Sequence, residues 1–169
     1  MKTKKITYLG LMVGYSLILY IIETYIPNPL IAIFPGAKLG LSNIVTLLAL
    51  LTLGFKDTFV ILSIRILLSS IFAGPMSYLL FSVAGGYLSL FAMYLTSKIP
   101  GFSTIGISLS GAVFHNIGQL LVASLIINNI KMVGYLPFML IASLVTGAFI
   151  GIVVHFAEPK LSKIQKLFH

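Results

Sequence analysis

The segment FVILSIRILL, residues 59–68, places a single charge, Arg65, inside an otherwise uncharged run. The whole chain is similarly apolar, with 59% hydrophobic residues, 8% charged residues and a mean hydropathy of +1.10. A soluble domain carries about 25% charged residues, so this composition predicts an integral membrane protein. An arginine at bilayer depth costs roughly 2.5–3.5 kcal/mol on insertion scales, and it is tolerated where it faces a bundle interior or a polar cavity. Arg65 therefore indicates a buried anion site, unless helix carbonyls or Glu23 satisfy it.

Apolar runs of about 20 residues, the length that crosses a bilayer, account for nearly the whole chain. We interpret the first run as a retained span rather than a signal peptide, because it contains Glu23 and lacks a small-residue cleavage site. The fold class predicted is all-α: one polytopic membrane helix bundle over residues 1–169. Its six predicted transmembrane helices cover residues 6–26, 38–54, 58–73, 76–95, 104–127 and 134–156.

The lysines are distributed unevenly between the predicted loops. With the N-terminus inside, the cytoplasmic loops and tails hold Lys2, Lys4, Lys5, Lys56, Lys98, Lys160, Lys163 and Lys166. The outer side holds only Lys38 and Lys131. Because cytoplasmic loops carry the excess of positive charge, both termini are predicted to be cytoplasmic. The net charge of +8 is then explained by topology and anionic lipid headgroups rather than by nucleic acid.

Polar residues that are unusual in lipid fall on several predicted spans. His115 and Gln119 are four residues apart and share a helix face, with Asn116 beside them. We expect the polar residues to converge on one cavity in the outer half of the bundle, open to the outside, that binds a small solute. The candidate substrate-binding residues are Glu23, Lys38, Asn43, Arg65, His115, Asn116 and Gln119.

The segment PGAKLGLSN, residues 35–43, breaks the backbone before a predicted helix. The helix N-terminus presents N–H groups with a partial positive charge, and Lys38 adds a full charge there, which favours an anionic or polar ligand. Simpler interpretations remain open. Lys38 can reach the headgroups from a loop-to-helix entry. His115 can be a hydrogen-bonded packing residue, and Glu23 the counter-ion of Lys38 or Arg65.

Two pairs of glycines are spaced one helical turn apart. Gly10 and Gly14 lie near the cytoplasmic end of the first span, and Gly147 and Gly151 repeat the spacing in the last. Small residues at this spacing allow helices to approach closely, within one chain or between subunits. We interpret Gly10 and Gly14 as a docking surface for another membrane subunit, with ordinary internal packing as the alternative.

Three motifs carry a family resemblance: PGAKLGLSNIVTL (residues 35–47), FSVAGG (81–86) and GAVFHNIGQ (111–119). They resemble the small bacterial membrane proteins of the heptaprenyl diphosphate synthase component I, or Gx transporter, family. That family is in turn similar to the substrate-binding S components of energy-coupling-factor (ECF) transporters. The resemblance implies six helices in the bacterial cell membrane, an outward ligand pocket, and a transmembrane coupling subunit with ATPase subunits as partners. In S components small residues of the first helix contact the coupling subunit, where this chain has Gly10 and Gly14 instead of the usual alanine.

The number of acidic residues in the chain bears on whether it can act as a prenyl diphosphate synthase. Prenyl diphosphate synthases hold magnesium with aspartate clusters, because hard cations require oxygen ligands. This chain has only Asp57, Glu23 and Glu158, which lie far apart, and it has no cysteine. It also lacks a nucleophile with a base and an ATP-binding motif, so we predict no catalysis, no metal and no cofactor.

The favoured function is that of a substrate-binding component of an ECF-like importer for a small polar or anionic solute. The alternative is a non-catalytic membrane partner of isoprenoid or quinone biosynthesis that binds a prenyl diphosphate. A stand-alone carrier or structural membrane protein is a third hypothesis, although the two halves of the chain share no motif that would indicate an inverted repeat.

Overall fold

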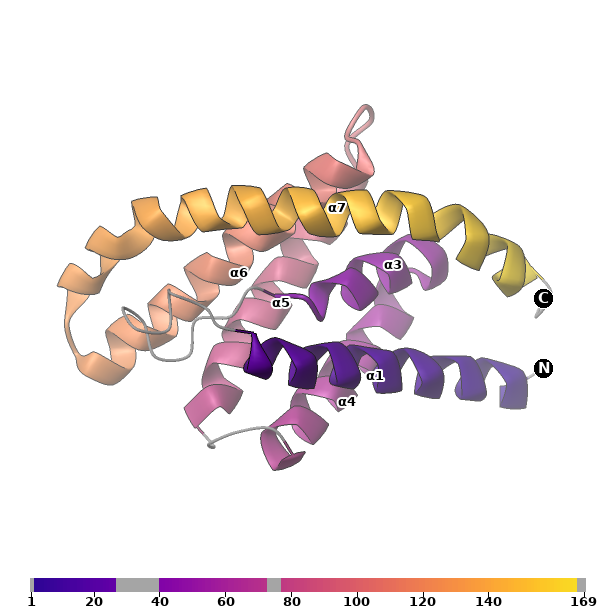
Figure 1. The fold of residues 1–169 in the computed structure, drawn as a ribbon, viewed down its shortest axis with the longest axis horizontal. Coiled ribbons are helices and arrows are strands. Elements are labelled where there is room, and N and C mark those ends of the chain that lie inside the picture. The colour runs from indigo at the N-terminus through magenta and orange to yellow at the C-terminus, as the bar shows by residue number, and fades with distance from the viewer. Residues whose placement is uncertain (1, 27–39, 73–76, 167–169) are drawn as a thin grey trace.

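The computed structural model describes residues 2–26, 40–72 and 77–166 of the chain (Figure 1). Every regular element in these ranges is a helix, which confirms the all-α prediction. The elements are α1 (Lys2–Tyr25), α3 (Asn43–Leu53), α4 (Phe55–Phe72), α5 (Ser77–Ser97), α6 (Thr104–Ile127), the 3-10 helix η1 (Ile130–Tyr135) and α7 (Leu136–Lys166).

Four stretches of the described helices are long and apolar enough to cross a membrane. They are Thr3–Tyr25 in α1, Leu79–Ser97 in α5, Thr104–Ile127 in α6 and Val133–Ser162, which is mostly α7. The membrane character predicted from composition is thus found in four of the six predicted spans. For the spans predicted at residues 38–54 and 58–73, crossing stays a prediction.

The second predicted span is wrong in its extent. Helix α3 has 11 residues, so it is ~16 Å long, about half of a ~30 Å hydrocarbon core. Residues 41–42 form a turn before it, and Gly40 has a φ of +83°, a left-handed conformation that favours glycine. Between Asn43 and Leu50, all residues except the half-buried Ile44 are buried. A helix that is apolar all round is typical of a core position, and α3 is such an interior helix.

Three further boundaries differ from the prediction. Helix α4 begins at Phe55, because Gly54 alone, with a φ of +82°, links it to α3. Helix α7 begins two residues after the predicted residue 134, where η1 precedes it. It continues beyond the predicted end at residue 156, through Pro159 to Lys166. Leu161, beyond the proline, packs against the hydrophobic core, and this contact favours continuation of the helix.

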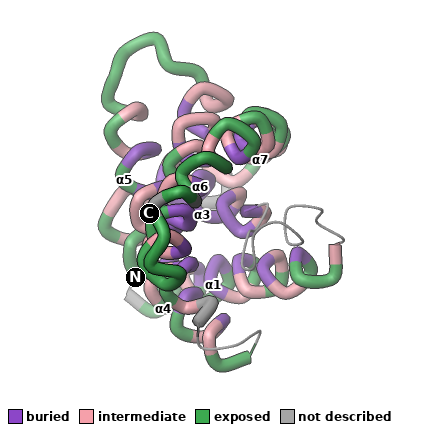
Figure 2. Tube along the Cα trace, turned by 90° about the vertical axis from the view of Figure 1, so that its left-hand side faces the viewer, coloured by how far each residue is buried: buried purple, intermediate pink, exposed green. Residues whose placement is uncertain are grey.

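The helices form an elongated bundle in which α1 and α7 run along the long axis (Figure 1). Helix α1 begins and α7 ends at the same end of the molecule, as expected if both termini lie on one side of a membrane. Most buried positions lie toward the middle of the bundle, and exposed positions follow its outer stretches (Figure 2). Many exposed side chains are large and apolar, such as Ile71, Leu125 and Phe156, each at least 70% exposed. This outer surface is suited to lipid rather than to water.

Glycines allow α5 and α7 to pack closely against α6. A Cβ added to Gly118 would lie 2.6 Å from the backbone oxygen of Ala84 in α5. On the other side of α6, a Cβ on Gly151 of α7 would lie 2.7 Å from the Cα of Ile105. Gly147 is placed in the same way, 3.0 Å from the Cα of Leu109. The small-residue pair of the last span therefore serves packing within the chain.

Candidate functional site

Glu23 lies in the last turns of α1 and is only 5% exposed. Its two carboxylate oxygens accept hydrogen bonds from the backbone N–H groups of Gly40, at 2.5 Å, and of Leu41, at 3.0 Å. These N–H groups belong to the turn that precedes α3, and buried backbone donors of this kind need a hydrogen-bond partner. The carboxylate thus fixes the entry to α3 against the end of α1.

His115 lies where the α3 entry meets α5 and α6. A Cβ added to Gly40 would lie 3.0 Å from Asn43 Nδ2 and 3.9 Å from His115 Cδ2. On the opposite side, a Cβ on Gly85 of α5 would lie 3.0 Å from His115 Cε1 and 3.1 Å from Nδ1. The imidazole is therefore held between two glycines, with Asn43 close by. The structure brings Glu23, Asn43 and His115 to one place.

Arg65 is 2% exposed, in the middle of α4. Its guanidinium carbon lies 5.6 Å from the ring centre of Tyr20 on α1, a cation–π distance. Glu23 and Tyr20 also interact with it electrostatically. Within the part of the chain that the structure describes, Arg65 Nε and Nη2 have no hydrogen-bond partner. A buried donor without a partner costs about 1–3 kcal/mol, more when charged, so these two N–H groups favour an oxyanion ligand.

Two amide side chains of α6 have different surroundings. Gln119 is 1% exposed and lies one turn beyond His115 on the same helix face. Asn116 turns to α7, where its Nδ2 donates to the carbonyl oxygen of Met139 at 3.0 Å and to Ser143 Oγ at 2.7 Å. These hydrogen bonds of Asn116 join α6 to α7, and its contact with a ligand stays a prediction.

Lys38, the seventh candidate, lies outside the described residues, so its predicted role also stays a prediction. Conversely, sequence reasoning missed Tyr20 and the two glycines that contact His115. Tyr20 comes three residues before Glu23, a spacing that puts both on one helix face. The sequence pattern could therefore have indicated Tyr20 as a neighbour of Glu23. Gly85 lies in the FSVAGG motif, but no spacing rule connects it to His115 on another helix. Over the described ranges, no group of three or more His, Cys, Asp or Glu side chains is placed to hold a metal ion.

Gly10 and Gly14 have surroundings unlike those of the glycines in α6 and α7. A Cβ added to either of them would meet no atom within 4 Å in the described structure. Both line an open groove of ≈ 500 Å³ on α1, together with Leu11 and Ile18. In the described structure, these two glycines therefore leave an unoccupied surface rather than a packed helix contact.

A family profile described as heptaprenyl diphosphate synthase component I matches residues 12–157. No curated protein and no solved structure matches the chain. The family match covers most of the sequence and includes the three motifs of residues 35–47, 81–86 and 111–119. The chain therefore belongs to the heptaprenyl diphosphate synthase component I family.

Proposed function

We propose that this protein is the substrate-binding membrane component of an ECF-like importer in the bacterial cell membrane. It captures a small polar or anionic solute from the outer side. The observation that carries this proposal is the buried guanidinium of Arg65, whose Nε and Nη2 have no hydrogen-bond partner among the described residues. A carboxylate or phosphate group matches two adjacent guanidinium N–H groups in geometry and in charge.

The neighbours of Arg65 supply the other requirements of a solute site. The ring of Tyr20 covers the guanidinium, and Glu23 is within electrostatic range. Elsewhere in the bundle, Asn43 at the start of α3 and His115 and Gln119 on α6 are further buried polar groups. A small number of polar groups inside an otherwise apolar bundle is typical of sites that orient a small ligand. A negative Glu23 close to the bound anion would favour solutes that also carry a hydrogen-bond donor.

We infer that the protein itself does not catalyse a reaction. Its three acidic residues, Glu23, Asp57 and Glu158, are spread along the chain, and Glu23 already binds backbone N–H groups. Energy for transport would come from a transmembrane coupling subunit and ATPase subunits. Those partners would meet the open surface at Gly10 and Gly14.

The family description favours a second candidate function. A component I of a synthase implies a partner component, so the chain would be a non-catalytic membrane partner of isoprenoid or quinone biosynthesis. Arg65 would then bind the diphosphate of a prenyl diphosphate, and the apolar helix faces would bind its chain.

Mass spectrometry of small molecules released from gently purified protein distinguishes these functions. A stoichiometric water-soluble compound would support the importer and identify its solute. A polyprenyl phosphate or a quinone precursor would support the biosynthetic function instead. Absence of both, from protein that retains its helical content and melting temperature, would contradict the two proposals together.

Replacing Gly10 and Gly14 together with leucine is expected to abolish association with the coupling subunit and to leave the bundle folded. Because a Cβ at either position meets no described atom within 4 Å, the larger side chains fill only the open groove. Co-purification of partner subunits measures association, and the released solute measures binding. The double alanine variant is the matched control and should keep association, since alanine is still small. Simultaneous loss of solute and of thermal stability would instead indicate that these glycines serve internal packing.

A further inference from the structure

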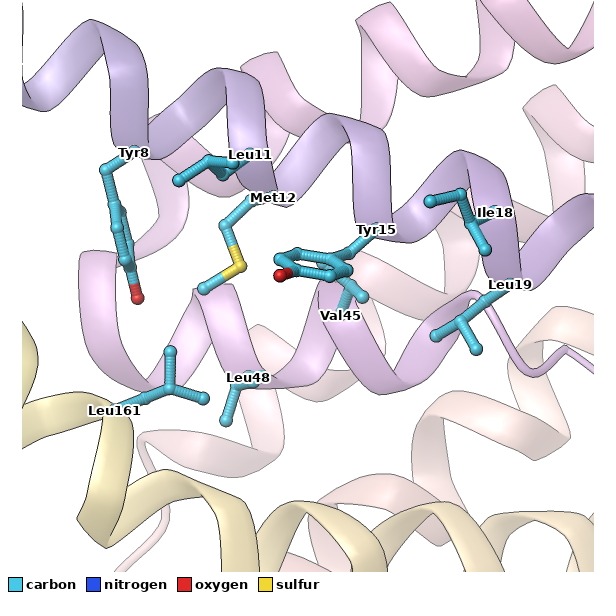
Figure 3. Close-up of a pocket in the computed structure, with 9 residues that line it drawn as sticks. All are labelled: Tyr8, Leu11, Met12, Tyr15, Ile18, Leu19, Val45, Leu48 and Leu161. Atoms are coloured by element: carbon cyan, nitrogen blue, oxygen red, sulfur yellow. The ribbon is translucent and has the colours of Figure 1, made fainter.

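A second groove follows the side of α1 that faces α3 and the end of α7 (Figure 3). It has a volume of ≈ 430 Å³, and its side chains are hydrocarbon, thioether or tyrosine. Figure 3 shows side chains from three helices facing this space, among them Tyr8, Met12 and Leu19 of α1, Val45 and Leu48 of α3 and Leu161 of α7. Such a surface fits an apolar chain and offers little to a polar solute.

The length of this groove matches one leaflet of a bilayer. Its lining runs along α1 from Tyr8 to Leu19, which at 1.5 Å per residue is ~16 Å. Half of a ~30 Å hydrocarbon core is ~15 Å. The groove also lies parallel to α1, one of the helices suited to crossing a membrane. Its dimensions and direction are therefore those of a single acyl chain in one leaflet.

Positive charge lies at one end of the groove. Lys4 is exposed and one turn before Tyr8, on the same face of α1. Lys160 is exposed and adjacent to Leu161, where α7 reaches the groove. The distribution of lysines predicts that this end lies at the cytoplasmic surface, where anionic headgroups attract basic side chains.

We propose that this groove binds one acyl chain of an anionic phospholipid from the cytoplasmic leaflet, with the headgroup at Lys4 and Lys160. The bound chain would fill the space between α1 and the helices α3 and α7. It would also support the ridge of Leu11, Tyr15 and Ile18, which separates this groove from the one at Gly10 and Gly14. The inference is independent of the solute that binds near Arg65.

The chain contains no tryptophan, so one introduced tryptophan reports its own surroundings. Tyr15→Trp places the fluorophore in the groove, and Phe149→Trp places it on the exposed face of α7. The two positions are matched in exposure, because Tyr15 is 61% and Phe149 is 53% exposed. Both are aromatic, and each lies eleven residues from a lysine near a chain end, Lys4 for Tyr15 and Lys160 for Phe149. Each variant is reconstituted into phosphatidylcholine vesicles that contain a minor fraction of phosphatidylglycerol with brominated, fluorescence-quenching acyl chains.

In the Tyr15→Trp variant, we expect quenching to show an enrichment of phosphatidylglycerol on the order of tenfold over its bulk fraction. In the Phe149→Trp variant, quenching should follow the bulk fraction. Adding Lys4→Gln and Lys160→Gln to Tyr15→Trp should remove the enrichment. Because both lysines are exposed, the fold should be unaffected, as circular dichroism would show.

Equal quenching at the two positions would overturn the proposal, as would enrichment that persists without the two lysines. Unlabelled lipids provide the remaining test. Relief of quenching by excess unlabelled phosphatidylglycerol supports the phospholipid. Relief by a trace of polyprenyl diphosphate, with no effect of phosphatidylglycerol, overturns the proposal in favour of an isoprenoid chain. Neither result depends on whether a solute is released from the protein.

Discussion

Replacing Gly118 with alanine is expected to destabilise the folded bundle by about 1–3 kcal/mol, or more if the helices cannot adjust. The added Cβ would lie 2.6 Å from the oxygen and 2.7 Å from the carbon of the Ala84 carbonyl, and 2.8 Å from the Gly85 nitrogen. All three atoms belong to the backbone of α5, so no side-chain rotation relieves the contact. Helices α5 and α6 must separate, and His115, which touches Gly85, must move with α6.

Thermal unfolding in detergent, followed by circular dichroism, measures this effect, and two alanine variants calibrate it. Gly111→Ala should cost less than Gly118→Ala, because its closest neighbours are side-chain atoms of Met93, which can rotate away. Gly10→Ala should leave stability unchanged or raise it, because no described atom lies within 4 Å and alanine favours helix. Equal melting temperatures for all three variants would contradict the close packing of α5 and α6.

The helical class could be predicted from the sequence because composition and run length report directly on burial in lipid. The extent of α3 could not be predicted, because its residues are as apolar as a true span. What shortens it is the turn at Gly40, held by the carboxylate of Glu23 seventeen residues earlier. The extension of α7 past Pro159 likewise depends on a contact of Leu161 with the core. Both differences arise from tertiary contacts that local propensity does not contain.

For the candidate residues, the sequence indicated which ones are buried polar groups, and their role in binding stays a prediction. Arg65, Glu23 and His115 were proposed because they are charged or polar residues within apolar runs. The structure places Glu23 within electrostatic range of Arg65, and it places His115 beside Gly40, whose N–H donates to Glu23. Helical periodicity placed Asn116 beside His115 but could not show which neighbouring helix each of them faces. Ser143, whose hydroxyl binds Asn116, is 27 residues away on α7. Spacing along one helix therefore identified the candidate residues but not the direction in which each side chain points.

Replacing Arg65 with methionine or alanine is expected to lower solute affinity by roughly 30- to 3,000-fold, so that purified protein carries no stoichiometric ligand. In the proposed importer, the anionic group of the solute would lose the charge-assisted hydrogen bonds that we assign to Arg65. Quantitative mass spectrometry of the released solute, per mole of protein, measures the change. Arg65→Lys should lose part of the affinity, since an ammonium keeps the charge but not the paired N–H geometry. Thr58→Val is the matched control. Thr58 is fully buried in the same helix, its hydroxyl donates to the Gly54 carbonyl within the described structure, and its replacement should leave binding unchanged.

The fold of the Arg65 variants separates a ligand-binding arginine from a structural ion pair. Glu23 accepts backbone N–H groups with both of its carboxylate oxygens, so loss of Arg65 does not leave that carboxylate without hydrogen bonds. Methionine of similar length removes a buried charge and keeps most of the packing, a change that is often neutral or stabilising. We therefore expect Arg65→Met to insert and melt like the unaltered protein while its solute is lost. A large drop in melting temperature with full solute occupancy would show instead that Arg65 holds α4 to α1 and binds nothing.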